Sequence, residues 1–357
     1  MFMGQVLCAC LAAFVLFLAP SDAHAKQVKD RVKRDFRHAD ENGDGELSRA
    51  EWKRRGNFER LDRNGNGALS LDEVRAIYKD HDQRNYDWPP KDMAAIAEDI
   101  DPTIAQDRMN RDALDKETMC GIGRALKCDI EPQKNRGLIE TGTGPRFPDN
   151  ANCPGIDDYW AMDYASKRER QSFHGGIDLP VPWGTPVRAV ADGSVVTLYT
   201  ADNSKRGAEV VVRHSPAQTD LPMWTYSAYG HLDVLPDLKV GQKLKMGQII
   251  GPTGNTGITA MGSKGDSQSS TRRPAIHLAM FYSATNTYSE VNDTIVPVDG
   301  YWLDPMAFYR QKEPFESHAV KALPESEKDV DIPILFDDGM TWPPDTKVIW
   351  PYTCKRN

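Results

Sequence analysis

The sequence predicts a multidomain protein in which a small all-α module precedes a larger antiparallel all-β domain. Two acidic twelve-residue loops lie close together near the front of the chain. Behind them, short β-branched and aromatic runs alternate with Gly, Pro and Asp turns, a pattern typical of antiparallel sheets. We divide the mature chain into a front module at 26–82, a helical linker region at 83–136, the β domain at 137–310 and a C-terminal extension at 311–357.

Residues 1–25 have the features of a secretory signal peptide. An apolar run from Val6 to about Ala19 ends at Pro20, and the small-residue cleavage pattern Ala23-His24-Ala25 follows it. The run is shorter than the roughly 20 apolar residues that a membrane helix needs. We therefore expect an exported protein, periplasmic or secreted, with no stable membrane span after signal cleavage.

Charge and cysteine content limit the partners and the redox environment. The net charge of −8 at pH 7 argues against nucleic acid or an anionic membrane surface as the main partner. Four of the six cysteines lie in the mature part, and an even number in an exported protein favours disulfides. Three pairings are possible. Cys120 with Cys128 would close a short loop, and Cys153 with Cys354 would then tie the tail to the β domain.

Both acidic loops match the EF-hand calcium motif, so the front module is expected to be an EF-hand pair. In this motif oxygen ligands occupy positions 1, 3, 5, 7 and 12 of the loop, and a glycine at position 6 makes the turn. The expected calcium ligands are Asp40, Asn42, Asp44, the Glu46 carbonyl and Glu51 in the first loop, and Asp62, Asn64, Asn66, the Ala68 carbonyl and Glu73 in the second. The alternative is a pair of acidic turns that binds nothing.

The EF-hand motif carries further expectations. Leu47 and Leu69 lie where paired loops form a short β-bridge, and helices are expected at 28–39, 49–62 and 71–81. The second loop replaces one charged ligand by Asn, so it should bind calcium more weakly. Because calcium is plentiful outside cells, we expect the ions to have a structural role rather than a sensing one.

The first candidate metal-binding motif of the β domain is His174-Gly175-Gly176-Ile177-Asp178. This spacing places an imidazole and a carboxylate four residues apart in a glycine-containing loop, where both can reach one cation. A hydrolytic zinc site needs a third ligand and a group that polarises the bound water. His231 and His277 lie downstream and could supply both.

Together with this pair, an ordered set of motifs resembles the lysostaphin/LytM-type zinc endopeptidases, which cut peptide cross-links in bacterial cell walls. The matching segments, in the family's order, are 174–178, 184–187, 191–195, 210–214, 229–232, 240–251 and 253–257. The resemblance implies a LytM-type, duplicated hybrid motif-like peptidase domain with a zinc groove across an antiparallel sheet. It also implies His174 and Asp178 as zinc ligands and His231 as a catalytic residue facing the bound water or the scissile carbonyl.

The last motif departs from the family. The family usually ends in His-x-His on a strand, where the second histidine binds zinc and the first helps catalysis, but this chain has only His277 there. We prefer the alignment with Ala275 in the first place and His277 in the second, because Pro274 then precedes the motif as in the family. The alternative puts His277 first and Ala279 second. Since all three positions face one side of a strand, geometry alone does not choose between them.

Several segments carry weaker expectations. His214 is expected on the sheet surface rather than as a ligand, and the polar insertion at 261–273 is expected as a long loop that either shapes substrate choice or is a plain surface loop. The linker region is expected to contain helices at 93–100 and 107–126. The tail after Phe308 is expected to form an extended strap without chemistry of its own.

Two functions compete. The first is an exported endopeptidase, with zinc and calcium as cofactors, that hydrolyses the peptides of peptidoglycan. The second is a catalytically weakened or inactive module that binds peptidoglycan or regulates other wall hydrolases. Ala275 favours the second, whereas the set His174, Asp178 and His277 favours the first, because metal ligands have little use on a docking surface. We expect the hydrolase.

Overall fold

The computed structural model describes residues 33, 36–52, 58, 62, 64–74, 86–90, 93, 96–123, 128–153, 164–165, 173–201, 206–257 and 274–357. The expected signal peptide and the polar insertion at 261–273 lie outside these residues. Within this part of the chain, no helix has the length and apolar character needed to cross a bilayer.

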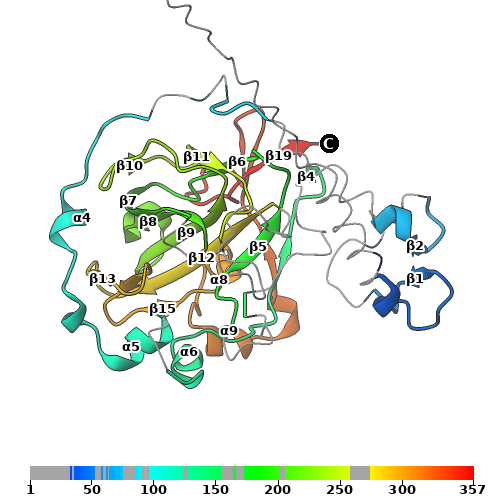
Figure 1. The fold of residues 1–357 in the computed structure, drawn as a ribbon, viewed down its shortest axis with the longest axis horizontal. Helices are drawn as coiled ribbons and strands as arrows, with labels where there is room; N and C mark the ends of the chain where they lie inside the picture. The colour runs from blue at the N-terminus through cyan, green and yellow to red at the C-terminus, as the bar shows by residue number, and fades with distance from the viewer. Residues whose placement is uncertain are drawn as a thin grey trace, which may run out of the picture.

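A seven-stranded sheet forms the centre of the β domain, and every strand pair in it is antiparallel, as the sequence predicted (Figure 1). The strands follow the order β10-β7-β8-β9-β12-β15, and β5 also pairs with β12. Their bounds are Ile177–Pro180 (β5), Gly193–Tyr199 (β7), Ala208–His214 (β8), Trp224–Leu232 (β9), Lys243–Leu244 (β10), Ala275–Ser283 (β12) and Tyr301–Trp302 (β15). The β-branched and aromatic runs that predicted strands lie inside these elements.

Two smaller sheets and a helical turn complete the domain. Pro186–Arg188 (β6) pairs with Ile249–Pro252 (β11), and Tyr288–Glu290 (β13) pairs with Ile295–Pro297 (β14). A short helix, Pro216–Thr219 (α7), joins β8 to β9. The long central strands are buried along nearly their whole length, since other parts of the chain cover both sheet faces. The buried positions include polar residues such as Glu209, Arg213 and Ser227.

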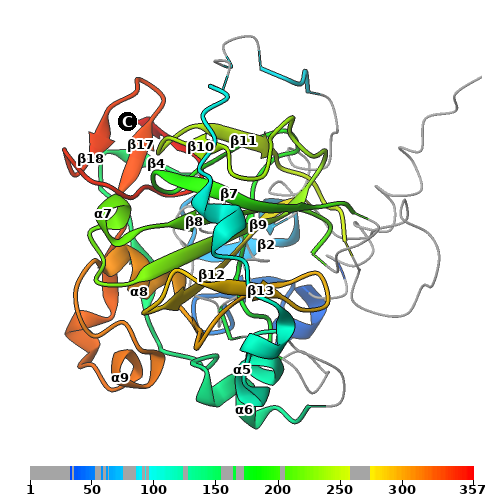
Figure 2. The ribbon, with the colours of Figure 1, turned by 90° about the vertical axis from the view of Figure 1, so that its left-hand side faces the viewer.

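The linker region contains less helix than expected. The predicted helix at 93–100 is wrong: the described residues 96–99 have no regular structure, and Ile100 forms a β-bridge with Gln242. The predicted helix at 107–126 is broken: within the described residues of that range, helical structure is limited to Arg111–Ala113 (η1) and Lys116–Gly121 (α5). Two further short helices, Thr103–Gln106 (α4) and Glu131–Asn135 (α6), lie on either side of it. Figure 2 shows this segment running across the sheet from α4 to α5. Contacts to the sheet outweigh helix propensity here; for example, Arg213 of β8 donates to Asp107 at 2.7 Å.

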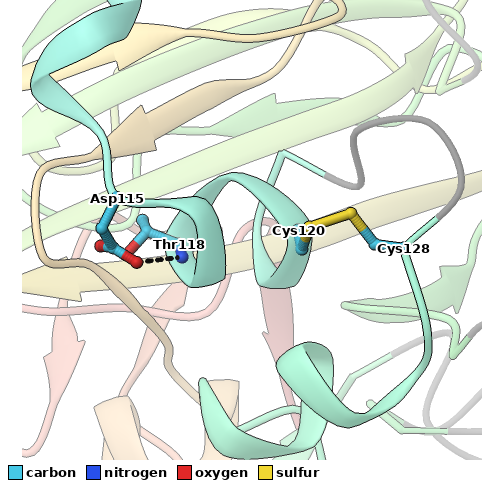
Figure 3. The surroundings of a disulfide bond; sticks show 4 residues. All are labelled: Asp115, Thr118, Cys120 and Cys128. Atoms are coloured by element: carbon cyan, nitrogen blue, oxygen red, sulfur yellow. Dashed lines mark hydrogen bonds between the residues drawn. A yellow bond between two sulfur atoms is a disulfide. The ribbon is translucent and has the colours of Figure 1, made fainter.

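The structure contains one of the three possible disulfide pairings. Cys120 of α5 is bonded to Cys128, and Cys153 is bonded to Cys354. Figure 3 shows the first bond near the C-terminal end of α5. At the other end of this helix, the Asp115 side chain caps the N-terminus by accepting a hydrogen bond from the Thr118 amide.

The C-terminal extension is folded, so the prediction of an extended strap is wrong. Helix Pro305–Arg310 (α8) precedes the extension. The extension itself contains Ser317–Lys321 (α9), Glu325–Glu327 (η2), Asp329–Asp331 (β16), Ile334–Phe336 (β17), Thr341–Trp342 (β18) and Thr353–Arg356 (β19). Two earlier strands pair with it, Gly144–Arg146 (β3) and Ala151–Asn152 (β4). Strands β18, β17, β19 and β4 form one sheet, and β16 pairs with β3. Trp350 and Tyr352 belong to the main core. Burial of such large rings anchors the tail.

The front module has a separate small core. Its strands Glu46–Ser48 (β1) and Ala68–Ser70 (β2) pair, with Leu47 opposite Leu69 as predicted. The described residues at 36–39 and 71–74 are helical, whereas 49–51 form a turn, so the middle helix does not begin at Arg49. The core consists of Phe36, Leu47, Trp52, Phe58, Leu69 and Val74.

Candidate metal centre

Sheet register brings the aspartate and the last histidine together. Asp178 of β5 lies directly opposite His277 of β12. Directly opposed residues of antiparallel strands project from the same face. The two side chains therefore meet, with His277 Nδ1 at 2.8 Å from Asp178 Oδ1.

The glycine loop before β5 adds the third side chain. His174 Nε2 lies 3.2 Å from Asp178 Oδ1. The loop approaches His277 so closely that a Cβ on Gly176 would lie 2.7 Å from His277 Nε2, and Gly176 also has a positive φ of 145°. A glycine is therefore required at this position. One ligand atom from each of His174, Asp178 and His277 lies within 4.8 Å of the other two.

The burial and protonation of these three side chains suit the binding of a cation. The residues His174, Asp178 and His277 are 7%, 3% and 3% exposed. Burial lowers the pKa of His277 to about 3, so its ring is neutral near pH 7, as metal ligation requires. Within the described part of the chain, His277 Nε2 is buried without a hydrogen-bond partner. A bound metal ion would satisfy such an atom. Two imidazoles and one carboxylate form a three-ligand set typical of catalytic zinc, which leaves a fourth position for water or substrate.

His231 lies beside the cluster but at a longer distance. It follows Gly230, the residue of β9 opposite His277. Its φ of 63° departs from strand geometry and breaks the alternation that would otherwise send its ring to the other face. His231 Nε2 lies 3.9 Å from Asp178 Oδ1.

Hydrogen bonds fix the orientation of the His231 ring. The Thr256 carbonyl can only accept, so His231 Nδ1, at 2.7 Å from it, is the donor. In the neutral ring Nε2 is then the unprotonated nitrogen, and it is the one nearer Asp178. The Arg206 carbonyl accepts the His231 amide at 2.7 Å. Sequence reasoning gave Thr256 and Arg206 no role; Thr256 lies in a matched motif, but nothing in the sequence singled out Arg206.

Ala275 and Ala279 do not join the cluster. Ala275 lies opposite Pro180 and is 4% exposed, while Ala279 lies opposite Ala228 and is fully buried. His277 is thus the residue of this strand that reaches Asp178, as the preferred alignment expects of a ligand.

His214 is not on the sheet surface, contrary to the prediction. It is fully buried, with Nδ1 at 2.7 Å from the Asp192 carbonyl and Nε2 at 2.8 Å from the Ser227 hydroxyl. Burial lowers its pKa to about 4. The ring is neutral and packed inside the domain, so its role is structural.

The two acidic loops have the form that calcium binding needs. In the first, Asp40 accepts from the amides of Gly43 and Gly45 at 2.7 and 2.9 Å, and Glu51 accepts from the Ser48 amide and hydroxyl at 2.9 and 2.7 Å. These hydrogen bonds lower the pKa of Glu51, with the Ser48 hydroxyl contributing most. The second loop repeats the pattern, with Asp62 accepting from Gly67 and Glu73 from Ser70. Hydrogen bonds of this kind direct carboxylates toward the loop centre.

Comparison with known families agrees with this architecture. Residues 172–287 match peptidase family M23, and residues 34–54 and 58–78 match the EF hand. The fold and the side-chain cluster thus agree with a peptidase-type β domain that follows a pair of EF-hand loops in the sequence. The chain contains a LytM-type peptidase family M23 domain preceded by an EF-hand pair.

Two of the curated relatives each match over about a quarter of this chain. "Peptidoglycan DD-endopeptidase ShyA" of Vibrio cholerae serotype O1 is 39% identical over 90 residues, which are 25% of this chain and 18% of that protein. An "Uncharacterized metalloprotease" of Buchnera aphidicola subsp. Baizongia pistaciae is 33% identical over 91 residues, 26% of this chain and 22% of that protein. The chain therefore spans only about a fifth of the length of these relatives.

Solved structures of similar sequence include a point mutant of the catalytic domain of the prophage-encoded M23 protein EnpA from Enterococcus faecalis. It is 25% identical, and the match covers 44% of this chain and 95% of that one with a TM-score of 0.27. The catalytic domain of lysostaphin from Staphylococcus simulans is also 25% identical, with 39% and 80% of the chains covered and a TM-score of 0.27.

Proposed function

We propose that this protein is an exported zinc endopeptidase that hydrolyses peptide bonds of bacterial peptidoglycan. The observation that carries the proposal is the buried cluster of His174, Asp178 and His277, in which His277 Nε2 has no hydrogen-bond partner among the described residues. A relative named as a peptidoglycan endopeptidase supports the substrate class.

The three clustered residues would hold the zinc ion, which supplies a Lewis acid and lowers the pKa of bound water. The chain's own contribution is acid–base chemistry at His231. Because the Thr256 carbonyl holds the proton on Nδ1, Nε2 faces the cluster as a proton acceptor. The hydrogen bond from the His231 amide to Arg206 fixes the backbone that carries this ring. This arrangement lets His231 accept a proton at Nε2 and later return it to the leaving amine.

A second function is favoured by one specific residue. Ala275 occupies the place where the family has a catalytic histidine in the preferred alignment, so one of two expected catalytic imidazoles is missing. A domain of this kind would bind peptidoglycan or regulate other wall hydrolases while turning over slowly or not at all.

The front module is proposed to bind two calcium ions in a structural role. Its preformed loops and the paired strands β1 and β2 support this proposal. The expected ligand set contains more charged side chains in the first loop than in the second, so the first site should be tighter.

The test of the main proposal is digestion of purified peptidoglycan by the mature chain, in metal-stripped and zinc-reconstituted form, followed by chromatography of released muropeptides. We expect release that depends on zinc. If the reconstituted protein binds zinc yet releases no fragments, the regulatory or binding function replaces the hydrolase.

A further inference from the structure

Two hydrogen bonds that hold His231 lead to one short segment, residues 206–209. The Arg206 carbonyl accepts the His231 amide directly, at 2.7 Å. The Thr256 carbonyl accepts from His231 Nδ1, and the Thr256 hydroxyl in turn accepts from the Ala208 amide at 2.9 Å. His231 has a positive φ of 63°, which residues other than glycine rarely adopt, so surrounding contacts must hold it there. Segment 206–209 supplies such contacts, directly and through Thr256.

Gly207 brings this segment into close contact with Thr256. Its φ is 74°, and a Cβ added there would lie 2.5 Å from the Thr256 carbonyl oxygen, well inside van der Waals contact. The Thr256 hydroxyl also donates to the carbonyl of Leu232, the residue after His231, at 2.6 Å. A displacement of segment 206–209 would therefore move the carbonyl that keeps the proton on His231 Nδ1.

A buried ion pair closes segment 206–209. Arg206 donates to Glu209 through two nitrogens, Nε to Oε2 and Nη2 to Oε1, the latter at 3.0 Å. The Glu209 side chain is fully buried, and the Arg206 side chain is 16% exposed. The register of β8 against β9 shifts between Ala208 and Val210, so Glu209 is the extra residue of a β-bulge, a feature that redirects a side chain. Because loss of either partner would leave a buried charge without this counter-ion, the pair constrains the shape of the segment.

Strand β8 carries a second buried ion pair, which allows an internal comparison. Arg213 Nη1 lies 2.7 Å from Asp107 Oδ2, and the two side chains are 2% and 16% exposed. This pair ties the other end of β8 to the linker region, where Arg213 also donates to Thr103 at 2.7 Å. Breaking either pair should destabilise the domain, but only the first pair belongs to segment 206–209.

We propose that Arg206 and Glu209 are positioning residues for His231, because their ion pair keeps segment 206–209 in the form that binds the His231 amide and orients its ring. The inference rests on the proposed function, in which His231 accepts and returns a proton at Nε2. Both residues act through the Arg206 carbonyl and through Thr256. Since a displacement of about 1 Å can lower a catalytic rate by about a hundredfold, a small distortion of the segment would affect catalysis.

The ring of His231 reports this positioning without any turnover. Nitrogen NMR of the zinc-reconstituted mature chain distinguishes a proton on Nδ1 from one on Nε2, and the His231 signals are assigned by their absence in His231→Gln. The wild type should carry the proton on Nδ1. Glu209→Gln should shift the signals toward a mixture of both forms. Arg206→Lys should shift them less, because lysine keeps the charge but not the two-point hydrogen bond. The control Asp107→Asn should leave them unchanged, although it also breaks a buried ion pair.

Kinetics on a soluble cross-linked muropeptide separate positioning from stability and from substrate binding. Glu209→Gln should lower kcat about tenfold or more, with KM within about twofold of the wild type and the zinc content unchanged. Asp107→Asn should lower the thermal stability to a similar degree but keep kcat within about twofold. A purely structural ion pair at Glu209 would give the two variants the same kcat.

The proposal is overturned if Glu209→Gln and Arg206→Lys leave the His231 signals as in the wild type, or if Asp107→Asn shifts them equally. It is also overturned if the signals shift in an active enzyme while kcat does not fall. Should Glu209→Gln fail to fold, Arg206→Lys decides. A wild type that binds zinc but cleaves nothing refutes the proposed endopeptidase, and the NMR comparison then decides whether Arg206 and Glu209 position His231.

Discussion

The two kinds of candidate metal site in this molecule are built in opposite ways. Each calcium loop draws its expected ligands from one continuous stretch, such as Asp40 to Glu51, and its side chains are mostly exposed. The β-domain cluster instead joins Asp178 to His277, which is 99 residues further along the chain, and buries both. The first kind of site is formed by a turn, and the second exists only when the sheet is assembled.

Because they are built differently, the two kinds of site should be impaired by different changes. Backbone amides already orient the calcium-loop carboxylates, so affinity there should follow the number of charges. The β-domain cluster depends on the register of β5 and β12. A shift of this register by one residue would turn the His277 side chain to the other face of the sheet and separate it from Asp178.

Removing the long-range ligand should give the largest effect. His277→Ala should lower zinc content from about one ion per chain to nearly none. It should also reduce peptidoglycan hydrolysis more than about a hundredfold, since even outer-shell changes cost up to that much. Metal analysis and muropeptide chromatography measure both. The exposed His318→Ala is the matched control. Equal zinc in His277→Ala and wild type would remove His277 from the site.

Restoring a histidine at Ala275 tests the proposed alignment. Ala275→His should add a hydrogen-bond donor for the developing oxyanion, which is worth roughly a hundredfold in rate. His231→Ala in the same background should abolish the activity. Muropeptide release reports both variants, with Ala279→His as a control for the alternative alignment. If the wild type already hydrolyses peptidoglycan rapidly and Ala275→His does not change the rate, the alignment or the role of this position is wrong.

The calcium loops should respond more gradually and independently of each other. Glu51→Gln and Glu73→Gln should each weaken calcium binding at their own loop by about tenfold or more, because each removes a bidentate charged ligand. Calorimetry on the full mature chain measures this, with Glu46→Gln as a control because only its carbonyl is an expected ligand. The first loop should be the tighter one in the wild type. A metal-free protein that shows no heat on calcium addition would refute the module's proposed role.

The difference between local loops and a long-range cluster also explains how much of each site the sequence predicted. The twelve-residue loops and the bridge between Leu47 and Leu69 could be predicted, because the loop motif is local in the sequence. The sequence also predicted the antiparallel strands and the three clustered residues of the β domain, although the cluster rested on a family resemblance. It did not predict that Gly176 must be a glycine because His277 lies against it, since that contact is made only by folding.

The errors also concern contacts at long range. The helix expected at 107–126 does not begin at Asp107, which pairs with Arg213, and the tail expected as a strap buries Trp350 in the main core. Helix and strand propensities depend on the local sequence, so they do not predict contacts with distant partners. His214 was placed on the surface for the same reason, because its partners, the Asp192 carbonyl just before β7 and the Ser227 hydroxyl of β9, come from other parts of the chain.

The buried His214 provides the last and smallest test of the comparison. Its folded-state pKa of about 4 lies below the ordinary value of 6.5, so the unfolded chain takes up a proton first as the pH falls. This residue's contribution to stability is therefore complete above pH 6.5 and is lost progressively down to about pH 4. Between pH 6.5 and 5.5 the loss should be about 1 kcal/mol. Urea unfolding of the β domain at the two pH values measures it, and His214→Gln should reduce the acid sensitivity by that amount. The exposed His318→Gln is the control, and an unchanged pH dependence in His214→Gln would contradict the assignment of His214 as a buried neutral histidine.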